Sequence, residues 1–242
     1  MLRALTNSLS SIIYPQECRV CSSEVDDVGD GVACAACWNE TRFFSGKEML
    51  CRKCGAFFAA EAAAVPVSCH KCDEHHYDKA MALGVYEKGL AASILHLKAV
   101  PRLPRRVAAA IDAAYGFEVF NGVDLIIPVP LSRMRRHERG FNQAEIIADA
   151  VSRRVGVAVD RLSLTRTVHT PMHRVGMDQK ARELTIDKAF QVKRPSLVAG
   201  RDVLLVDDVL TSGATASQAA KVLKKNGAGR VNVFTLARAV LS

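Results

Sequence analysis

Residues 203–215 read VLLVDDVLTSGAT, which combines a strand pattern, an acidic pair and a loop of small residues. The four aliphatic residues 203–206 are typical of a parallel strand that is buried on both faces. Asp207 and Asp208 follow at its carboxyl end, where open α/β sheets bind their ligands. The small residues 211–215 then lead into a helical pattern. This order predicts a strand, a ligand-facing acidic pair and a loop at a helix N-terminus.

A loop of small residues at a helix N-terminus presents free backbone N–H groups to an anion, aided by the helix dipole. Two carboxylates beside bound phosphate are repulsive unless they accept hydrogen bonds from sugar hydroxyls, with Mg²⁺ nearby. The combination therefore predicts a ribose 5-phosphate site. The loop contains neither the GK[ST] of a Walker loop nor GxGxxG. The alternative is an ordinary strand–turn–helix whose Asp and Thr side chains cap the helix.

The same stretch is similar to the phosphoribosyl pyrophosphate (PRPP) motif of the type I phosphoribosyltransferases. The resemblance implies an α/β body with a mostly parallel, twisted sheet wrapped by helices. It implies that PRPP binds with Mg²⁺ and that Asp207 and Asp208 are catalytic residues on the ribose hydroxyls. It assigns the 5-phosphate contacts to Thr211, Ser212, Gly213, Ala214 and Thr215.

A second strand pattern, residues 124–127, leads into the stretch PVPLSRMRRHERGFNQ. Its prolines end strand pairing, and the pattern becomes helical from Phe141. The intervening basic loop carries four arginines, which suits the pyrophosphate group of PRPP. A solvated basic loop, or one that touches nucleic acid, is the alternative. We expect the pyrophosphate to contact Leu131, Ser132 and Arg133.

All eight cysteines lie near the N-terminus, in four CxxC pairs. Two such turns supply the four thiolates of a tetrahedral Zn²⁺ site. Twelve residues separate the first two pairs and fourteen separate the last two. We favour two zinc ribbons in series, because shorter loops cost less entropy to close, while a crossed arrangement remains open. The predicted ligands of two structural zinc ions are Cys18, Cys21, Cys34, Cys37, Cys51, Cys54, Cys69 and Cys72.

Two other uses of cysteine fit less well. Disulfides need an oxidising compartment, and the N-terminal residues lack the pattern of a signal peptide. A redox CxxC normally occurs once, beside a helix, rather than four times in one short stretch. The last pair is flanked by His70, His75 and His76, which we interpret as bystanders, because four complete cysteine pairs leave no vacant ligand position.

Charge divides the chain at about the same place as the cysteines. The net charge is −3 through Tyr77 and +11 beyond it, which together give the overall +8. We therefore expect a double zinc ribbon at 14–76 and a basic phosphoribosyltransferase-like domain at 77–242, with an anionic ligand or partner. No apolar run reaches the 18 residues that a membrane-spanning helix requires, so we expect a cytoplasmic protein without membrane insertion.

The segment PVPLSRMRRHERGFNQAEIIA resembles the signature of the ComF family, whose members pair an N-terminal zinc ribbon with a phosphoribosyltransferase-like domain. The resemblance extends to the cysteine pairs and to the closing VNVFTLARA strand, and it implies an association with natural competence and the use of external DNA. Residues 166–190 match the family's hood segment only loosely. Within that segment Arg182 fits the family's arginine, and we expect it to be catalytic.

These features leave two main hypotheses. The first is an enzyme that transfers the phosphoribosyl group of PRPP with release of pyrophosphate, to an acceptor that the sequence does not identify. The second is a non-catalytic adaptor that senses PRPP or a nucleotide and engages DNA or competence proteins. A simple single-stranded-DNA-binding body has little support, because aromatic residues make up only 6% of the chain and form no interleaved stacking platform.

Overall fold

The computed structural model describes residues 16–45, 48, 50–56, 69, 72, 74–167 and 189–240. A parallel sheet of four strands lies at its centre, in the spatial order β1-β6-β5-β2. A single parallel bridge from Ile126 to Val159 continues pairing beyond the last strand. The four strands are β1 (Lys79–Val85), β2 (Leu125–Pro128), β5 (Val203–Leu210) and β6 (Val231–Arg238).

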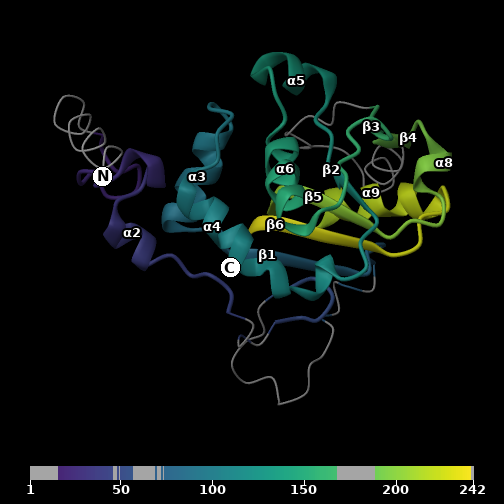
Figure 1. The fold of residues 1–242 in the computed structure, drawn as a ribbon, viewed down its shortest axis with the longest axis horizontal. Helices are drawn as coiled ribbons and strands as arrows, with labels where there is room; N and C mark the ends of the chain where they lie inside the picture. Colours follow the sequence, from purple (N-terminus) through teal and green to yellow (C-terminus); the bar gives the residue numbers. More distant parts are fainter. Residues whose placement is uncertain are drawn as a thin grey trace, which may run out of the picture.

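Helices cover both faces of this sheet, as parallel strands require (Figure 1). One face is covered by α3 (Lys88–Leu97), α4 (Arg105–Ala113) and α6 (Gln143–Val155). The other is covered by α9 (Ala214–Lys225), together with the antiparallel pair β3 (Leu164–Arg166) and β4 (Phe190–Val192). The short elements are η1 (Val28–Asp30), α2 (Ala35–Asn39), η3 (Ala114–Gly116), η4 (Glu118–Phe120), α5 (Arg133–Arg139) and α8 (Pro195–Val198).

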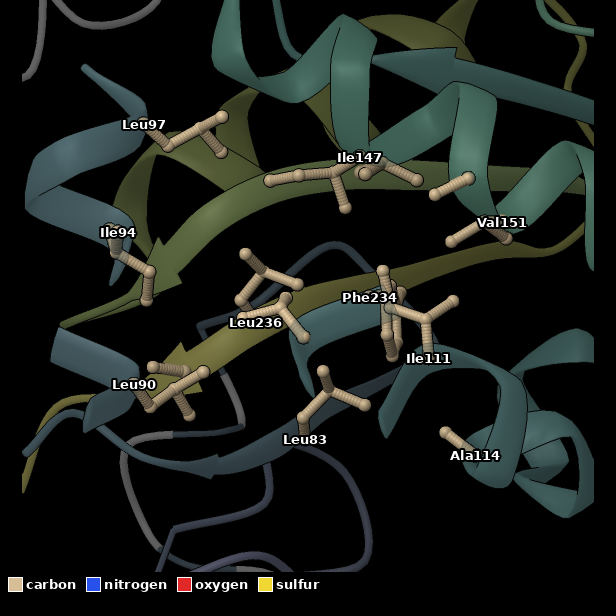
Figure 2. Packing of buried hydrophobic residues seen from close by; sticks show 14 of the residues in the cluster. Leu83, Leu90, Ile94, Leu97, Ile111, Ala114, Ile147, Val151, Phe234 and Leu236 are labelled. Atoms are coloured by element: carbon tan, nitrogen blue, oxygen red, sulfur yellow. The ribbon is translucent and has the colours of Figure 1, made fainter. Parts of the chain in front are cut away.

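Alternation along β5 divides the hydrophobic core between the two faces. Leu204 and Val206 join the core beneath α3, α4 and α6, while Val203 and Leu205 join the core beneath α9. All four side chains are at most 1% exposed. Figure 2 shows the first core, in which Ile147 of α6 lies near Phe234 and Leu236 of β6. Full burial of an aliphatic side chain contributes about 1.5–3 kcal/mol to the stability of the folded state. The buried side chains of the two cores therefore hold the sheet and its helices together.

Each group of cysteines belongs to a different core. Cys18, Cys34 and Cys37 pack into the α3/α4/α6 core together with the buried Trp38. Cys51, Cys54 and Cys72 pack into the α9 core with the buried Tyr77. The chain between the two groups also pairs with the sheet, since Phe43 bridges Gly84 of β1. The division at 76/77 stays a prediction, because both cysteine modules share their cores with the body.

Two local features differ from the sequence-based expectation. The basic segment after β2 was expected to be a loop, but residues 133–139 form helix α5, capped by Ser132. Strand β5 also continues past the acidic pair to Leu210, because its pairing with β6 extends as far as Arg238. Asp207 and Asp208 therefore lie within a paired strand rather than after it. No helix in the described part of the chain combines the length and apolar character needed to span a bilayer.

Candidate functional site

A cleft of about 370 Å³ opens where the carboxyl ends of β2 and β5 meet the N-terminus of α9. It brings together residues far apart in the sequence, from the loop after β1 to the end of β6. The acidic pair and the two threonines of the predicted loop share this cleft with four cationic side chains. Its lining consists of Tyr86, Lys98, Val129, Pro130, Leu131, Arg135, Arg139, Asn142, Gln143, Arg166, Asp207, Asp208, Val209, Thr211, Thr215 and Ala239.

The two acids of β5 are half-buried in this cleft and interact with each other. The backbone N–H of Asp208 donates a hydrogen bond of 2.9 Å to the Asp207 carboxylate. Burial, followed by the negative charge of Asp208, raises the pKa of Asp207 to about 8. Arg166 and Lys98 act in the opposite direction but do not offset this effect. Asp207 is therefore a carboxyl group whose ionisation depends on what else enters the cleft.

The loop before α9 makes a left-handed turn at the helix N-terminus. Gly213 is the N-cap of α9 and has φ of 80°, a left-handed conformation that glycine adopts without strain. The amides of the first helical turn have no intrahelical acceptors, and the helix dipole adds positive potential there. Thr211 and Thr215 line the cleft, whereas Ser212, Gly213 and Ala214 are not among its lining residues. The loop can therefore hold an anion through its amides and its two threonine hydroxyls.

Four cations line the cleft together with the two acids. Lys98 is the C-cap of α3, and Arg166 comes from β3. Arg135 and Arg139 lie one helical turn apart on α5, so they share a face of that helix. Arg139 donates a 2.9 Å hydrogen bond to the Gln143 side-chain oxygen. The surplus of positive charge suits a ligand that carries several negative charges.

The three residues predicted to contact pyrophosphate have different positions. Leu131 lines the cleft. Ser132 is buried, and its hydroxyl accepts a hydrogen bond from the Arg135 N–H at the start of α5. Arg133 lines a neighbouring pocket of about 620 Å³, on the other side of α5, together with Arg136. Helical periodicity explains the outcome, because α5 turns Arg133 away from the face that carries Arg135.

The RGFNQ segment contributes polar residues that sequence analysis assigned to no role. Asn142 caps α6, and its side-chain amide donates a 3.0 Å hydrogen bond to the Val129 carbonyl, which fixes α6 against the loop after β2. The buried side-chain Nε2 of Gln143 has no hydrogen-bond partner among the described residues. Because Gln143 also lines the cleft, this N–H donor can serve a bound ligand. The predicted catalytic Arg182 lies outside the described residues.

The cysteines form two groups of four, each made of consecutive pairs. Within each group the sulfur atoms all lie within 4.8 Å of one another. The closest contacts, from 3.2 to 3.6 Å, are similar to the separation of about 3.8 Å that tetrahedral Zn–S bonds of 2.3 Å impose. Backbone N–H groups also point at the sulfurs, as from Cys34 to Cys18 and from Cys69 to Cys51, both at 3.3 Å. Both groups fit structural zinc sites, and both follow the predicted sequential arrangement.

Two known domain families match separate parts of the chain. The double zinc ribbon domain family matches residues 9–73, and the phosphoribosyl transferase domain family matches residues 139–240. A DNA utilization protein of Shigella flexneri is 29% identical over 94% of this chain and 99% of its own length. Competence protein F of Haemophilus influenzae is 29% identical over 85% of this chain and 90% of its own length.

Competence protein ComFC of Bacillus subtilis is 32% identical over 47% of this chain and 44% of its own length. Among solved structures, a glutamine PRPP amidotransferase from B. subtilis overlaps 53% of this chain and 25% of that chain, with 16% identity and a TM-score of 0.37. The relatives that match almost end to end carry DNA utilization and competence names. With a match to the double zinc ribbon domain ahead of a match to the phosphoribosyl transferase domain, the chain is similar over most of its length to proteins of the ComF/YhgH family.

Proposed function

We propose that this chain binds PRPP in the cleft at the end of β5 and transfers its phosphoribosyl group, with release of pyrophosphate. One observation carries the proposal: the acidic pair and two threonines of the loop before α9 line the same cleft, which four cations also line. A sugar phosphate needs hydroxyl acceptors next to a phosphate pocket, and this cleft supplies both. The match of residues 139–240 to the phosphoribosyl transferase domain supports the same ligand.

Each part of PRPP has a proposed partner. The amides and hydroxyls of Thr211–Thr215 hold the 5-phosphate, and Asp207 and Asp208 accept hydrogen bonds from the ribose hydroxyls. The pyrophosphate lies beside Leu131, and Arg135 and Arg139 bind it in place of Arg133, because they line the cleft and Arg133 lines the neighbouring pocket. The aspartate oxygens are suitable Mg²⁺ ligands, and bound Mg²⁺ would neutralise charge on the pyrophosphate.

The proposed reaction is a substitution at C1 of the ribose. The acceptor forms a new bond to C1, while the bond from C1 to pyrophosphate oxygen breaks and its electron pair leaves with the pyrophosphate. Positive charge develops on the sugar as the bond breaks, and the carboxylates of Asp207 and Asp208 stabilise it. Arg135 and Arg139 stabilise the departing negative charge, and Arg182 remains a proposed catalytic residue. The chain thus acts by positioning and electrostatics.

A second function is favoured by charge and by the relatives. The region beyond Tyr77 carries a net charge of +11, and relatives are called DNA utilization and competence proteins. In this alternative the cleft binds PRPP or a nucleotide without turnover, and the basic surface engages DNA or competence proteins. The two functions share the ligand site and differ in whether pyrophosphate is released.

PRPP with Mg²⁺ should stabilise the protein against heat. At a ligand concentration 100-fold above Kd the gain is about 2.7 kcal/mol. For a chain of this size the gain raises Tm by roughly 5–10 °C. We expect the double substitution Asp207→Asn with Asp208→Asn to remove this shift, and the exposed Asp112→Asn on α4 to retain it. A full shift in the double variant would refute the site, and no shift in the unmodified protein would refute PRPP binding.

Two assays run side by side separate the enzyme from the adaptor. The first measures pyrophosphate release from PRPP across a panel of nucleobases and amines. The second titrates single-stranded DNA at several salt concentrations, because contacts with phosphates lose affinity as salt rises. Release that depends on one acceptor supports the transferase. Salt-sensitive DNA affinity without release across the panel supports the adaptor.

A further inference from the structure

The phosphate loop, Thr211–Thr215, is in direct contact at Gly213 with the segment Glu74–Tyr77. This segment follows the second cysteine group, which consists of Cys51, Cys54, Cys69 and Cys72. A Cβ atom placed on Gly213 would lie 2.9 Å from the Tyr77 hydroxyl and 3.0 Å from Nε2 of His75. The two rings stack on each other, with centroids 4.9 Å apart. Tyr77 is only 1% exposed, so it forms a fixed wall behind the loop. The left-handed turn at Gly213 therefore has no free space on that side.

Hydrogen bonds connect the same segment to the first turn of α9. The backbone N–H of His76 donates to the Ser217 hydroxyl at 3.1 Å, and that hydroxyl donates to the Glu74 carbonyl at 3.5 Å. Ser217 is 5% exposed, and its own backbone N–H donates to the Gly213 carbonyl at 2.8 Å. The position of the amides that would bind phosphate therefore depends on the position of Glu74–Tyr77.

The segment is in turn held by the second cysteine group. The backbone N–H of His75 donates to the Cys72 carbonyl at 3.1 Å. Lys53, which lies inside the second group's first CxxC turn, donates to the His75 carbonyl at 2.8 Å. Arg238 of β6 donates to the Cys54 carbonyl at 2.8 Å. The turns that carry the four sulfurs and the segment behind the loop are thus one connected structure.

The first cysteine group provides an internal control, because it packs elsewhere. Trp38 of its helix lies against Gly89 of α3, where an added Cβ would be 2.8 Å from the indole ring. The Thr41 hydroxyl accepts a hydrogen bond from the Gly89 N–H at 3.1 Å. Asp30 forms ion pairs with Arg105 and Arg106 of α4. These contacts lie on α3 and α4, not on α9.

We propose that the second zinc ribbon positions the phosphate loop, with His75 and Tyr77 as positioning residues, so that zinc at this site and a phosphorylated ligand at the loop bind with positive coupling. The proposal rests on the proposed function in one respect, namely that the loop binds phosphate. Coupling between two sites is reciprocal, so the ligand must also strengthen zinc binding. Zinc at Cys18, Cys21, Cys34 and Cys37 is not coupled in this way.

The decisive experiment uses the unmodified, zinc-loaded chain. A colorimetric zinc chelator and a thiol-alkylating reagent are added with and without PRPP and Mg²⁺, and mass spectrometry locates the labelled cysteines over time. We expect PRPP to slow labelling of the second group at least about fivefold and to leave the first group within twofold. Equal effects on both groups, or none while calorimetry detects PRPP binding, would overturn the coupling.

A second measurement does not require PRPP. Hydrogen exchange of the amides at 213–217 is followed while the second zinc is removed, with the α6 amides at 143–155 as the internal reference. We expect exchange at 213–217 to accelerate at least tenfold before α6 changes. If exchange at 213–217 does not change, the positioning role is wrong whatever ligand the cleft binds. If exchange accelerates but calorimetry detects no PRPP binding, the positioning stands and the proposed function fails.

One variant separates positioning from general stability. His75→Ala removes the ring behind Gly213 without touching a predicted zinc ligand. We expect affinity for ribose 5-phosphate to fall about tenfold, while affinity for inorganic pyrophosphate, which is assigned to the arginine side of the cleft, stays within twofold. His96→Ala is the matched control, since His96 is also half-buried and lies on α3 near the first ribbon. Equal losses for both ligands would overturn the positioning role.

Discussion

At the scale of single residues, the carboxyl group of Asp207 lies in surroundings that disfavour its charged form. It is half-buried beside Asp208, and these two facts raise its pKa to about 8. A carboxyl group in the unfolded chain titrates near 4. The folded protein therefore retains a proton that the unfolded chain releases between these two values. A carboxyl group whose pKa is raised this far by burial and a neighbouring charge is typical of a functional position.

The sign of the resulting pH dependence follows from linkage. The group stabilises the folded state fully below about pH 4, and this contribution is lost as the pH rises through about 8. Between these pH values, each unit of rising pH lowers the free energy of unfolding by at most about 1.4 kcal/mol for the one proton that the folded state retains. Asp207→Asn should flatten the profile from pH 6 to 8, a window that leaves the thiolates bound to zinc. Urea unfolding at both pH values measures this, with Asp112→Asn as the control, and parallel profiles for Asp207→Asn and the unmodified protein would contradict it.

At the scale of elements, helix α5 determines which arginines reach the cleft. Arg135 and Arg139 are half-buried on its cleft-facing side, and Arg133 is exposed beside the neighbouring pocket. A charged hydrogen bond contributes about 1.5–3 kcal/mol, so Arg135→Ala should weaken pyrophosphate binding roughly 10- to 100-fold. Arg133→Ala, a change of the same size on the same helix, should leave affinity within about twofold. Isothermal titration decides between them, and a larger loss in Arg133→Ala would restore the original assignment of Arg133.

Local sequence patterns predicted some of these elements correctly and missed others, including helix α5. The strand at 203–206 and the zinc groups are readable because their signals are local, namely an aliphatic run and cysteine spacing. The helix at Arg133–Arg139 was interpreted as a loop, because its seven residues contain no apolar stripe and it forms through the Ser132 cap. The burial of Gln143 Nε2 without a partner among the described residues, and the contact of His75 and Tyr77 with Gly213, depend on tertiary structure that no local pattern encodes.

At the scale of the whole molecule, the two zinc ribbons are parts of the body's cores rather than appendages. The first completes the core beneath α3, α4 and α6, and the second completes the core beneath α9. Figure 1 shows α2 on the side of α3 and α4 away from the sheet, so the first ribbon reaches the sheet core through these helices. Loss of either zinc should therefore expose the core on one face of the sheet. The same four strands form both cores, so damage to one core weakens the other. The chain should therefore unfold as one cooperative unit.

The chain's single tryptophan tests this cooperativity. Trp38 lies in the first ribbon and is 4% exposed, so its fluorescence reports that ribbon, while far-UV circular dichroism reports the helices and sheet of the body. In urea with zinc present we expect the two transitions to coincide in midpoint and slope, because neither part retains its core alone. Trp38→Phe identifies the source of the fluorescence signal. A fluorescence midpoint well below the circular dichroism midpoint would instead mean that the first ribbon unfolds on its own, and that the division at 76/77 separates two independent domains.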